Sequence, residues 1–195
     1  MEENDLKNKF KVVVIGGSAG SLSVLFEMLP ALRTDLSIAI ILVLHRKNSA
    51  DSSLSALLST KTLIPTREVE DKDPILPGNI YLAPADYHLL IEKDYIFSLD
   101  YSEKVNFSRP SLDVTFESAA DVFGPDLTAI LLSGANDDGT EGLIAVKKTD
   151  GFAIAQKPES AQMPFMPQHA ISNMEIDLVL DIKGISDFIN SLATH

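Results

Sequence analysis

The sequence predicts a three-layer α/β/α protein with a mostly parallel, Rossmann-like, doubly wound sheet and an inserted β-hairpin. Continuous apolar runs rich in β-branched residues are typical of strands buried on both faces, and they occur at 11–15, 38–44 and 126–132. Segments with apolar residues at helical spacing alternate with such runs through most of the chain. This alternation favours a parallel sheet with helices on both faces.

The elements can be placed in order by their periodicity. The expected strands lie at 11–15, 38–44, 80–83, 88–92, 95–99, 126–132, 152–156 and 177–180. The expected helices lie at 21–32, 51–58, 111–123, 140–148 and 185–192. The two strands at 88–92 and 95–99 flank Lys93-Asp94 and form the inserted antiparallel hairpin.

Local signals refine three of these segments. Pro30 is expected to end or bend the first helix early. Ser111 is the expected N-cap of the helix over 111–123, with Asp113 and Glu117 early in the helix, where its dipole favours acids. The segment 158–167, rich in Pro and Met, is expected to be irregular, as a surface loop or part of a site wall.

Composition limits the possible functions. The 195 residues predict a disordered segment or short extension at 1–9 and a single domain over 10–195. The absence of cysteine excludes disulfides, thiol nucleophiles and thiolate metal sites. A net charge of −12 with no basic patch argues against binding to nucleic acid or to an anionic membrane. Because no signal peptide or membrane-spanning run is present, we expect a cytoplasmic protein without membrane insertion.

A G-x-S-x-G sequence, Gly16 to Gly20, follows the first strand directly and precedes a helix. Such a turn would expose Ser18 on a strained backbone, and the helix N-terminus would offer N–H groups to an oxyanion, so Ser18 is the candidate nucleophile. A phosphate or dinucleotide loop and a simple turn are the alternatives. Two observations argue against the dinucleotide loop. Ser18 occupies the position of the middle glycine, and His45 stands after the second strand, where an acid is expected.

His45 ends the second strand, which we expect beside the first. The carboxyl ends of parallel strands meet at one edge of the sheet, so His45 should lie near Ser18, where a neutral imidazole would activate the serine. A capping or surface histidine is the alternative. His88, His169 and His195 are weaker candidates, since they lie in the hairpin, after a proline and at the last position.

A carboxylate from the loop after the third buried strand would complete a triad. Either Asp137 or Asp138 could orient the imidazole, and the pattern alone does not choose between them. The alternatives are a turn or helix N-cap and a magnesium site. The chain order Ser, His, Asp differs from the Ser, Asp, His order of α/β-hydrolases, which disfavours the ordinary esterase and lipase fold.

Five segments in order, VVVIGGSAGS, LVLHR, IYLAPADYHL, RPSLDVTFESAA and AILLSGANDDGTEG, resemble the catalytic domain of the chemotaxis protein-glutamate methylesterase family, CheB. The resemblance runs from about Lys11 to the C-terminus. It implies hydrolysis of glutamate methyl esters on chemoreceptors, with glutamine deamidation in some members, and no cofactor or metal. Matched by motif, the triad is Ser18, His45 and Asp138.

The resemblance also implies partners. These are the helical cytoplasmic region of a methylated chemoreceptor or another signalling protein and, as a further candidate, a separate regulatory protein. Family enzymes of full length carry an N-terminal receiver domain, for which the residues before Phe10 leave no room. We therefore expect this chain to resemble the forms that stand alone.

The chain departs from the family pattern in its aspartate loop, where Ala135 replaces methionine and Asn136 replaces glycine. Backbone N–H groups of Ala19 and Ala135 are the expected oxyanion donors, and Arg46, Asn136 and Arg109 are expected to line the site. The loop changes keep a non-catalytic signalling or scaffold module as an alternative function, beside a hydrolase for another ester and a nucleotide-binding domain.

Overall fold

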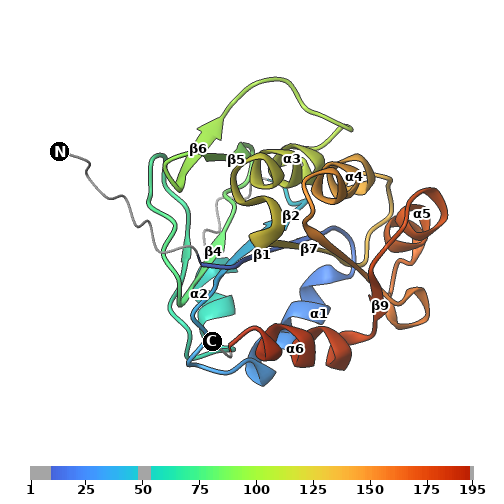
Figure 1. Ribbon diagram of the computed structural model, residues 1–195, viewed down its shortest axis with the longest axis horizontal. Helices are drawn as coiled ribbons and strands as arrows, with labels where there is room; N and C mark the ends of the chain where they lie inside the picture. Colours follow the sequence, from blue (N-terminus) through green and yellow to red (C-terminus); the bar gives the residue numbers. More distant parts are fainter. Residues whose placement is uncertain (1–9, 48–53, 194–195) are drawn as a thin grey trace.

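Seven parallel strands form the central sheet of the computed structural model, which describes residues 10–47 and 54–193 (Figure 1). The strands are β1 (Val12–Gly17), β2 (Ala39–Leu44), β3 (Thr66–Glu68), β4 (Asn79–Leu82), β7 (Leu127–Leu131), β8 (Phe152–Gln156) and β9 (Leu178–Leu180). They are arranged in the order β3-β4-β2-β1-β7-β8-β9, and all pairings are parallel. The winding direction reverses between β1 and β7. The carboxyl ends of these two strands therefore flank the crevice where doubly wound sheets bind ligands.

Helices cover both faces of the sheet, so the predicted three-layer α/β/α class is confirmed. One face carries α3 (Leu112–Phe123), α4 (Thr140–Lys148) and α5 (Phe165–Asn173). The opposite face carries α1 (Ser21–Met28), α2 (Leu54–Ser59) and α6 (Ile182–Ser191). Figure 1 shows α3 and α4 above the sheet and α1 and α6 below it.

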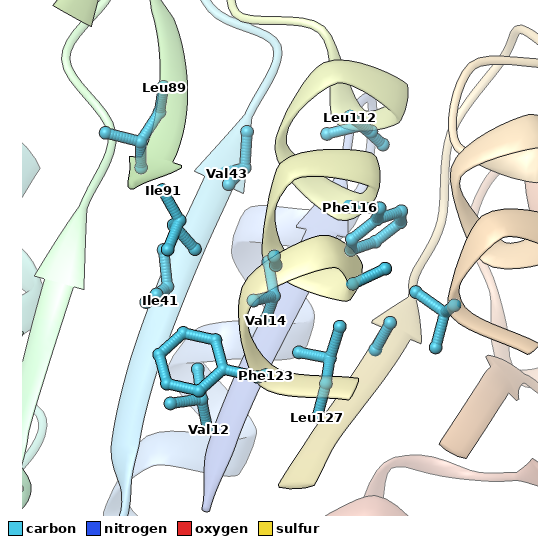
Figure 2. Packing of buried hydrophobic residues seen from close by; sticks show 14 of the residues in the cluster. Val12, Val14, Ile41, Val43, Leu89, Ile91, Leu112, Phe116, Phe123 and Leu127 are labelled. Atoms are coloured by element: carbon cyan, nitrogen blue, oxygen red, sulfur yellow. The ribbon is translucent and has the colours of Figure 1, made fainter. Parts of the chain in front are cut away.

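The core follows from the alternation of side chains along buried strands. Every residue of β1 and β2 is buried, as expected for central parallel strands covered on both faces. Figure 2 shows Val12 and Val14 with Ile41 and Val43 beneath α3. Their neighbours Val13 and Ile40 belong to the second cluster, under α1 and α6.

The predicted hairpin forms from β5 (His88–Glu92) and β6 (Ile96–Asp100), which pair antiparallel as a separate two-stranded sheet. Leu89 and Ile91 of β5 join the cluster beneath α3, as Figure 2 shows. The insertion therefore widens the layer that holds α3 and helps to fix the position of that helix.

Several boundaries differ from the sequence expectation. The first helix ends at Met28 and continues as a 3₁₀ turn, Leu29–Ala31, that contains Pro30. The short edge strand β3 was not predicted. The segment 158–167 is less irregular than expected, since it holds a 3₁₀ turn (Pro158–Ser160) and the start of α5. Helix α6 begins at Ile182, three residues earlier than predicted, because Asp181 accepts from the Gly184 N–H at 2.7 Å and caps it.

Two sequence expectations concern residues that lie outside the described ranges. These are the extension at 1–9 and the first residues of the helix expected at 51–58. Among the residues that the structure does describe, no helix has the length and apolar character needed to cross a membrane.

Candidate active site

Three loops meet at the carboxyl edge of the sheet, next to the reversal of strand order. Gly17 of β1 pairs with Leu44 of β2, so Ser18 and His45 are the next residues on adjacent strands. The His45 N–H donates to the Gly17 carbonyl at 3.1 Å, and the Ser18 N–H donates to the Ser133 carbonyl at 2.9 Å. Ser18, His45 and the loop after β7 are thus brought together by the sheet, as the sequence predicted.

The turn around Ser18 places the left-handed residue at Gly20, with φ of 83°. Ser18 itself has no positive φ, so the expected strained backbone at the serine is wrong. The Ser18 carbonyl accepts from the Ser21 N–H at 3.0 Å, which closes the turn into α1. Glycine is required at position 20 because a Cβ there would also lie 2.6 Å from the Ser133 Oγ.

The His45 imidazole is held by a buried carboxylate. Its Nε2 lies 2.6 Å from Asp138 Oδ2, and the two side chains are 10% and 0% exposed. Because an ionised carboxylate only accepts hydrogen bonds, Nε2 carries the proton and Nδ1 is left as the basic nitrogen. Nδ1 faces Ser108 Oγ at 3.4 Å and Asn136 Nδ2 at 3.5 Å. Within residues 10–47 and 54–193, Ser18 Oγ makes no hydrogen bond to the ring.

Asp138 also caps helix α3. Besides the imidazole, it accepts from the N–H groups of Leu112 (2.7 Å) and Asp113 (3.2 Å) at the helix N-terminus. It further accepts from Ser111 Oγ and Asn106 Nδ2, both at 3.0 Å. Burial alone would raise the pKa of Asp138, but the hydrogen bonds from His45, Asn106 and Leu112 outweigh it and lower the pKa to about 2. Asp138 is therefore an anion at neutral pH.

The expectation for Ser111 needs a correction. Ser111 does occupy the N-cap position of α3, but its hydroxyl makes no capping bond within the helix. It donates to Asp138 Oδ1 instead. The capping acceptor thus comes from another loop. Asp138, which is buried beside the imidazole, also accepts from the N–H groups at the start of α3.

A second buried carboxylate, Asp113, lies beside the first. Its Oδ1 accepts from the N–H groups of Gly139 (2.9 Å) and Gly142 (2.7 Å), which ties α3 to the start of α4. Asn106 Nδ2 bridges the two carboxylates, at 2.7 Å from Asp113 Oδ2 and 3.0 Å from Asp138 Oδ1. Burial, together with the nearby charge of Asp138, raises the pKa of Asp113 to about 6. The hydrogen bond from the Gly142 N–H lowers this pKa but does not outweigh the burial.

Two backbone N–H groups near Ser18 are free to bind an anion. In the described part of the chain, neither the Ala19 N–H nor the Ala135 N–H donates a hydrogen bond, and both residues are exposed. By contrast, the Gly134 N–H is engaged by the Met163 carbonyl at 3.0 Å. Ser133 Oγ donates to the Ala19 carbonyl at 2.7 Å and so joins the two loops that carry the free donors.

The two arginines expected to line the site have structural partners and also face a cavity. Arg46 pairs with Glu68 at 2.5 Å, and Arg109 pairs with Asp86 at 2.7 Å. A cavity of about 290 Å³ adjoins His45 and is lined by both arginines and by Lys47, Asp86, Lys104, Phe107 and Ser108. Asn136 does not line this cavity; its amide lies between His45 Nδ1 and the Asp138 N–H, which donates to Asn136 Oδ1 at 3.2 Å.

The weaker candidates are engaged elsewhere. His88 is buried and bonds to the Glu103 carbonyl at 2.8 Å. His169 lies 2.9 Å from Thr140 Oγ1, and His195 is outside the described residues. Asp137 is exposed, whereas its neighbour Asp138 is buried with its oxygens taken by donors, so the pair does not form the magnesium site considered from the sequence. No group of three or more His, Asp or Glu side chains suited to a metal ion occurs in the described ranges.

Sequence reasoning missed Asn106, Ser108 and the role of Asp113 in joining α3 to the start of α4. Asp113 carried a weak signal, since an acid in the first turn of a helix was noted. Asn106 and Ser108 carried no sequence signal, because their partners Asp138 and His45 lie 32 and 63 positions away along the chain.

A doubly wound sheet that carries an imidazole–carboxylate pair beside a serine at its carboxyl edge is typical of serine hydrolases with an α/β fold. The comparisons with known proteins identify the particular group. The model of the CheB methylesterase family matches residues 13–189. The chain therefore belongs to the CheB methylesterase family, a family of hydrolases.

Individual relatives agree with this assignment. A putative protein-glutamate methylesterase/protein-glutamine glutaminase of Leptospira interrogans is 40% identical over 178 residues, which cover 91% of this chain and 92% of the relative. The protein-glutamate methylesterase/protein-glutamine glutaminase of Thermotoga maritima is 34% identical over 180 residues, 91% of this chain but 52% of that protein. The crystal structure of the Thermotoga maritima CheB methylesterase catalytic domain superposes with a TM-score of 0.89 at 32% identity, covering 94% of this chain and 98% of that one.

Proposed function

We propose that this chain is a protein-glutamate methylesterase in which Ser18 is the nucleophile, His45 the general base and Asp138 the group that orients the imidazole. The observation that carries the proposal is the 2.6 Å contact between His45 Nε2 and Asp138 Oδ2, on the strand end adjacent to Ser18. The similarity to the relatives from Leptospira interrogans and Thermotoga maritima, both named as protein-glutamate methylesterases, supports the reaction.

The first half of the reaction forms an acyl-enzyme. Ser18 Oγ turns toward His45 Nδ1, gives up its proton and attacks the ester carbonyl of the glutamyl side chain. The contacts that Nδ1 makes with Ser108 and Asn136, at 3.4 and 3.5 Å, are long and are readily exchanged for a shorter bond from Ser18. The tetrahedral intermediate then breaks its C–O bond to the methoxy group, which takes the proton from Nδ1 and leaves as methanol.

The second half releases the product. A water molecule gives a proton to His45 Nδ1 and attacks the acyl carbonyl, and the Ser18 ester bond breaks as Nδ1 returns the proton to Oγ. The Asp138 anion stabilises the doubly protonated ring in both halves. In both tetrahedral species the oxyanion is held by the N–H groups of Ala19, just before α1, and of Ala135, in the loop after β7, which make no hydrogen bond within the described residues.

We propose the helical cytoplasmic region of a methylated chemoreceptor as the substrate, and the cytoplasm as the place of action. Deamidation of glutamine side chains is a second candidate activity, because the relatives carry glutaminase in their names. It would use the same acyl-enzyme with ammonia as the leaving group. A separate regulatory protein as partner remains an expectation from the family resemblance.

The test is methanol release from methyl-esterified receptor helices by the wild type, Ser18→Ala and Ser108→Ala. Ser108→Ala is the matched control, because it removes another serine hydroxyl close to the imidazole, at 3.4 Å from His45 Nδ1. We expect Ser18→Ala to lower kcat by a factor on the order of 10⁶ and Ser108→Ala to lower it less than roughly tenfold.

Three outcomes would contradict parts of the proposal. A larger loss in Ser108→Ala than in Ser18→Ala would assign the nucleophile to Ser108. Methanol release by neither the wild type nor a variant, with Ser18 still labelled by a fluorophosphonate, would indicate a hydrolase for another ester. Absence of both release and labelling would indicate a non-catalytic module.

A further inference from the structure

Phe107 has an unusual backbone for its residue type. Asn106 and Phe107 have φ of 50° and 60°, and they form the centre of a two-residue turn closed by Val105 and Ser108. The Ser108 N–H donates to the Val105 carbonyl at 2.9 Å, and the reverse bond is 3.2 Å. A turn with two left-handed residues favours asparagine followed by glycine, and a bulky side chain in the second position is strained.

The Phe107 side chain gains nothing from packing in return. It is 98% exposed, so burial within this chain does not compensate the strain of its backbone. Strained residues that persist without a local benefit are concentrated at sites where a ligand or partner makes contact. Phe107 is therefore a candidate contact residue for a ligand or partner.

The turn is anchored to the proposed catalytic pair. Asn106 Nδ2 bonds to Asp138 Oδ1 at 3.0 Å and to Asp113 Oδ2 at 2.7 Å. On the other side of Phe107, Ser108 Oγ lies 3.4 Å from His45 Nδ1. Phe107 is thereby held at a fixed place beside the imidazole rather than on a free loop.

The cavity next to Phe107 and His45 has a positive wall. Arg46, Lys47, Lys104 and Arg109 line it, with Asp86 as the only acid among the lining residues that the structure describes. In the described part of the chain, Lys47 and Lys104 form no ion pair. The buried Nε of Arg46 also lacks a hydrogen-bond partner among these residues. Within the described residues, the wall therefore offers two cations, Lys47 and Lys104, that form no ion pair, although the whole chain carries a net charge of −12.

We propose that the 105–108 turn and this cavity form a docking surface for an acidic, amphipathic helix that bears the ester. The inference rests on the proposed function for the position of the reacting carbonyl near Ser18. Phe107 packs against an apolar side chain of the helix, and Lys47 and Lys104 pair with carboxylates that lie three or four positions from the ester on the same helix face. Charge complementarity identifies this partner, since a helix rich in unmodified glutamates matches Lys47 and Lys104, which have no ion pair within the described residues.

Binding to the Ser18→Ala protein tests the docking surface separately from the chemistry. The probe is a fluorescein-labelled helical peptide with one glutamyl methyl ester flanked by glutamates, and its companion carries glutamines at the flanking positions. Fluorescence anisotropy gives Kd for each peptide at low and high salt. Three variants are compared on this background: Phe107→Gly, Lys47→Gln/Lys104→Gln and Leu63→Ala. Leu63→Ala is the control, because it removes an apolar side chain that is 87% exposed and does not line the cavity.

We expect the acidic peptide to bind about tenfold more tightly than the glutamine peptide, with the difference shrinking at high salt. Phe107→Gly should raise Kd about tenfold for the acidic peptide, and the double lysine variant should abolish the preference between the two peptides. Leu63→Ala should change neither value. Phe107→Gly should also raise Tm by about 2–4 °C, because glycine relieves the left-handed strain and no buried contact is lost.

Equal Kd for the two peptides with the Ser18→Ala parent protein would overturn the proposal, and so would a Phe107→Gly protein that binds like Leu63→Ala. A fall in Tm for Phe107→Gly would also overturn it, since the side chain would then have a structural role. Tight binding of the acidic peptide without methanol release by the wild type would instead refute the proposed reaction and leave the docking surface supported.

Discussion

Replacing Asp138 by asparagine should damage both activity and stability, and the structure allows each effect to be estimated. The carboxylate accepts five hydrogen bonds, three on Oδ1 and two on Oδ2. If the amide oxygen takes the Oδ1 side, its NH₂ group faces the Leu112 N–H and His45 Nε2. The unpaired Leu112 donor costs about 1–3 kcal/mol, and the lost anion at the helix N-terminus costs about 0.3–1 kcal/mol. We therefore expect the free energy of unfolding to fall by about 1–4 kcal/mol.

The catalytic effect follows from the tautomer. An NH₂ group beside Nε2 requires that nitrogen to accept, which moves the ring proton to Nδ1 and removes the base proposed to deprotonate Ser18. The equivalent change in other Ser-His-Asp triads suggests a loss in kcat of roughly 10³–10⁴. Urea unfolding and methanol release measure the two effects. Asp137→Asn is the matched control, because that side chain is exposed and forms no hydrogen bond in the described part of the chain. If Asp137→Asn were the more damaging of the two, the assignment of Asp138 would be wrong.

Two further predictions concern the residues around the site. Because the pKa of Asp113 is raised to about 6 in the folded protein, the folded state holds its proton more tightly than the unfolded state, so this group makes stability fall as pH rises from about 4 to 6. The urea midpoint of the wild type should decline over that range relative to Asp113→Asn, and parallel pH profiles would contradict the raised pKa. Gly20→Ala should lower the free energy of unfolding by at least about 2 kcal/mol, because it adds a close contact to left-handed strain. Gly78→Ala is the control: at φ of 75° its nearest neighbour lies 3.6 Å away, so it should cost only about 1–2 kcal/mol. Equal Tm losses for the two glycine variants would refute the crowding at Ser133.

The parts of the molecule that the sequence predicted well depend on local patterns and on one rule of topology. Continuous apolar runs identified β1, β2 and β7, and the shared carboxyl edge of parallel strands brought His45 beside Ser18. Helix α4 begins and ends at the expected residues because its apolar spacing and the preceding glycine both mark it.

The parts that the sequence did not predict depend on contacts between distant segments. Strand β3, Thr66–Glu68, is short, polar and only partly buried, so it shows no alternation to detect. Helix α5, Phe165–Asn173, was not predicted either, because the prolines at positions 164 and 167 argue against a helix there. The capping of α3 by Asp138 joins residues 25 and 26 positions apart, and the left-handed turn at Phe107 lacks the glycine that would have marked it.

The double use of Asp138 affects how an inactive member of this group would be recognised. A side chain that secures both an imidazole and the first turn of a helix is retained for folding even after the reaction is no longer needed. Ser18 differs, because its Oγ forms no bond within the described residues and its loss would leave the fold intact. Among chains that share this architecture, an aspartate at this position therefore says little about whether hydrolysis has survived. The serine is the informative position, because only the proposed chemistry requires it.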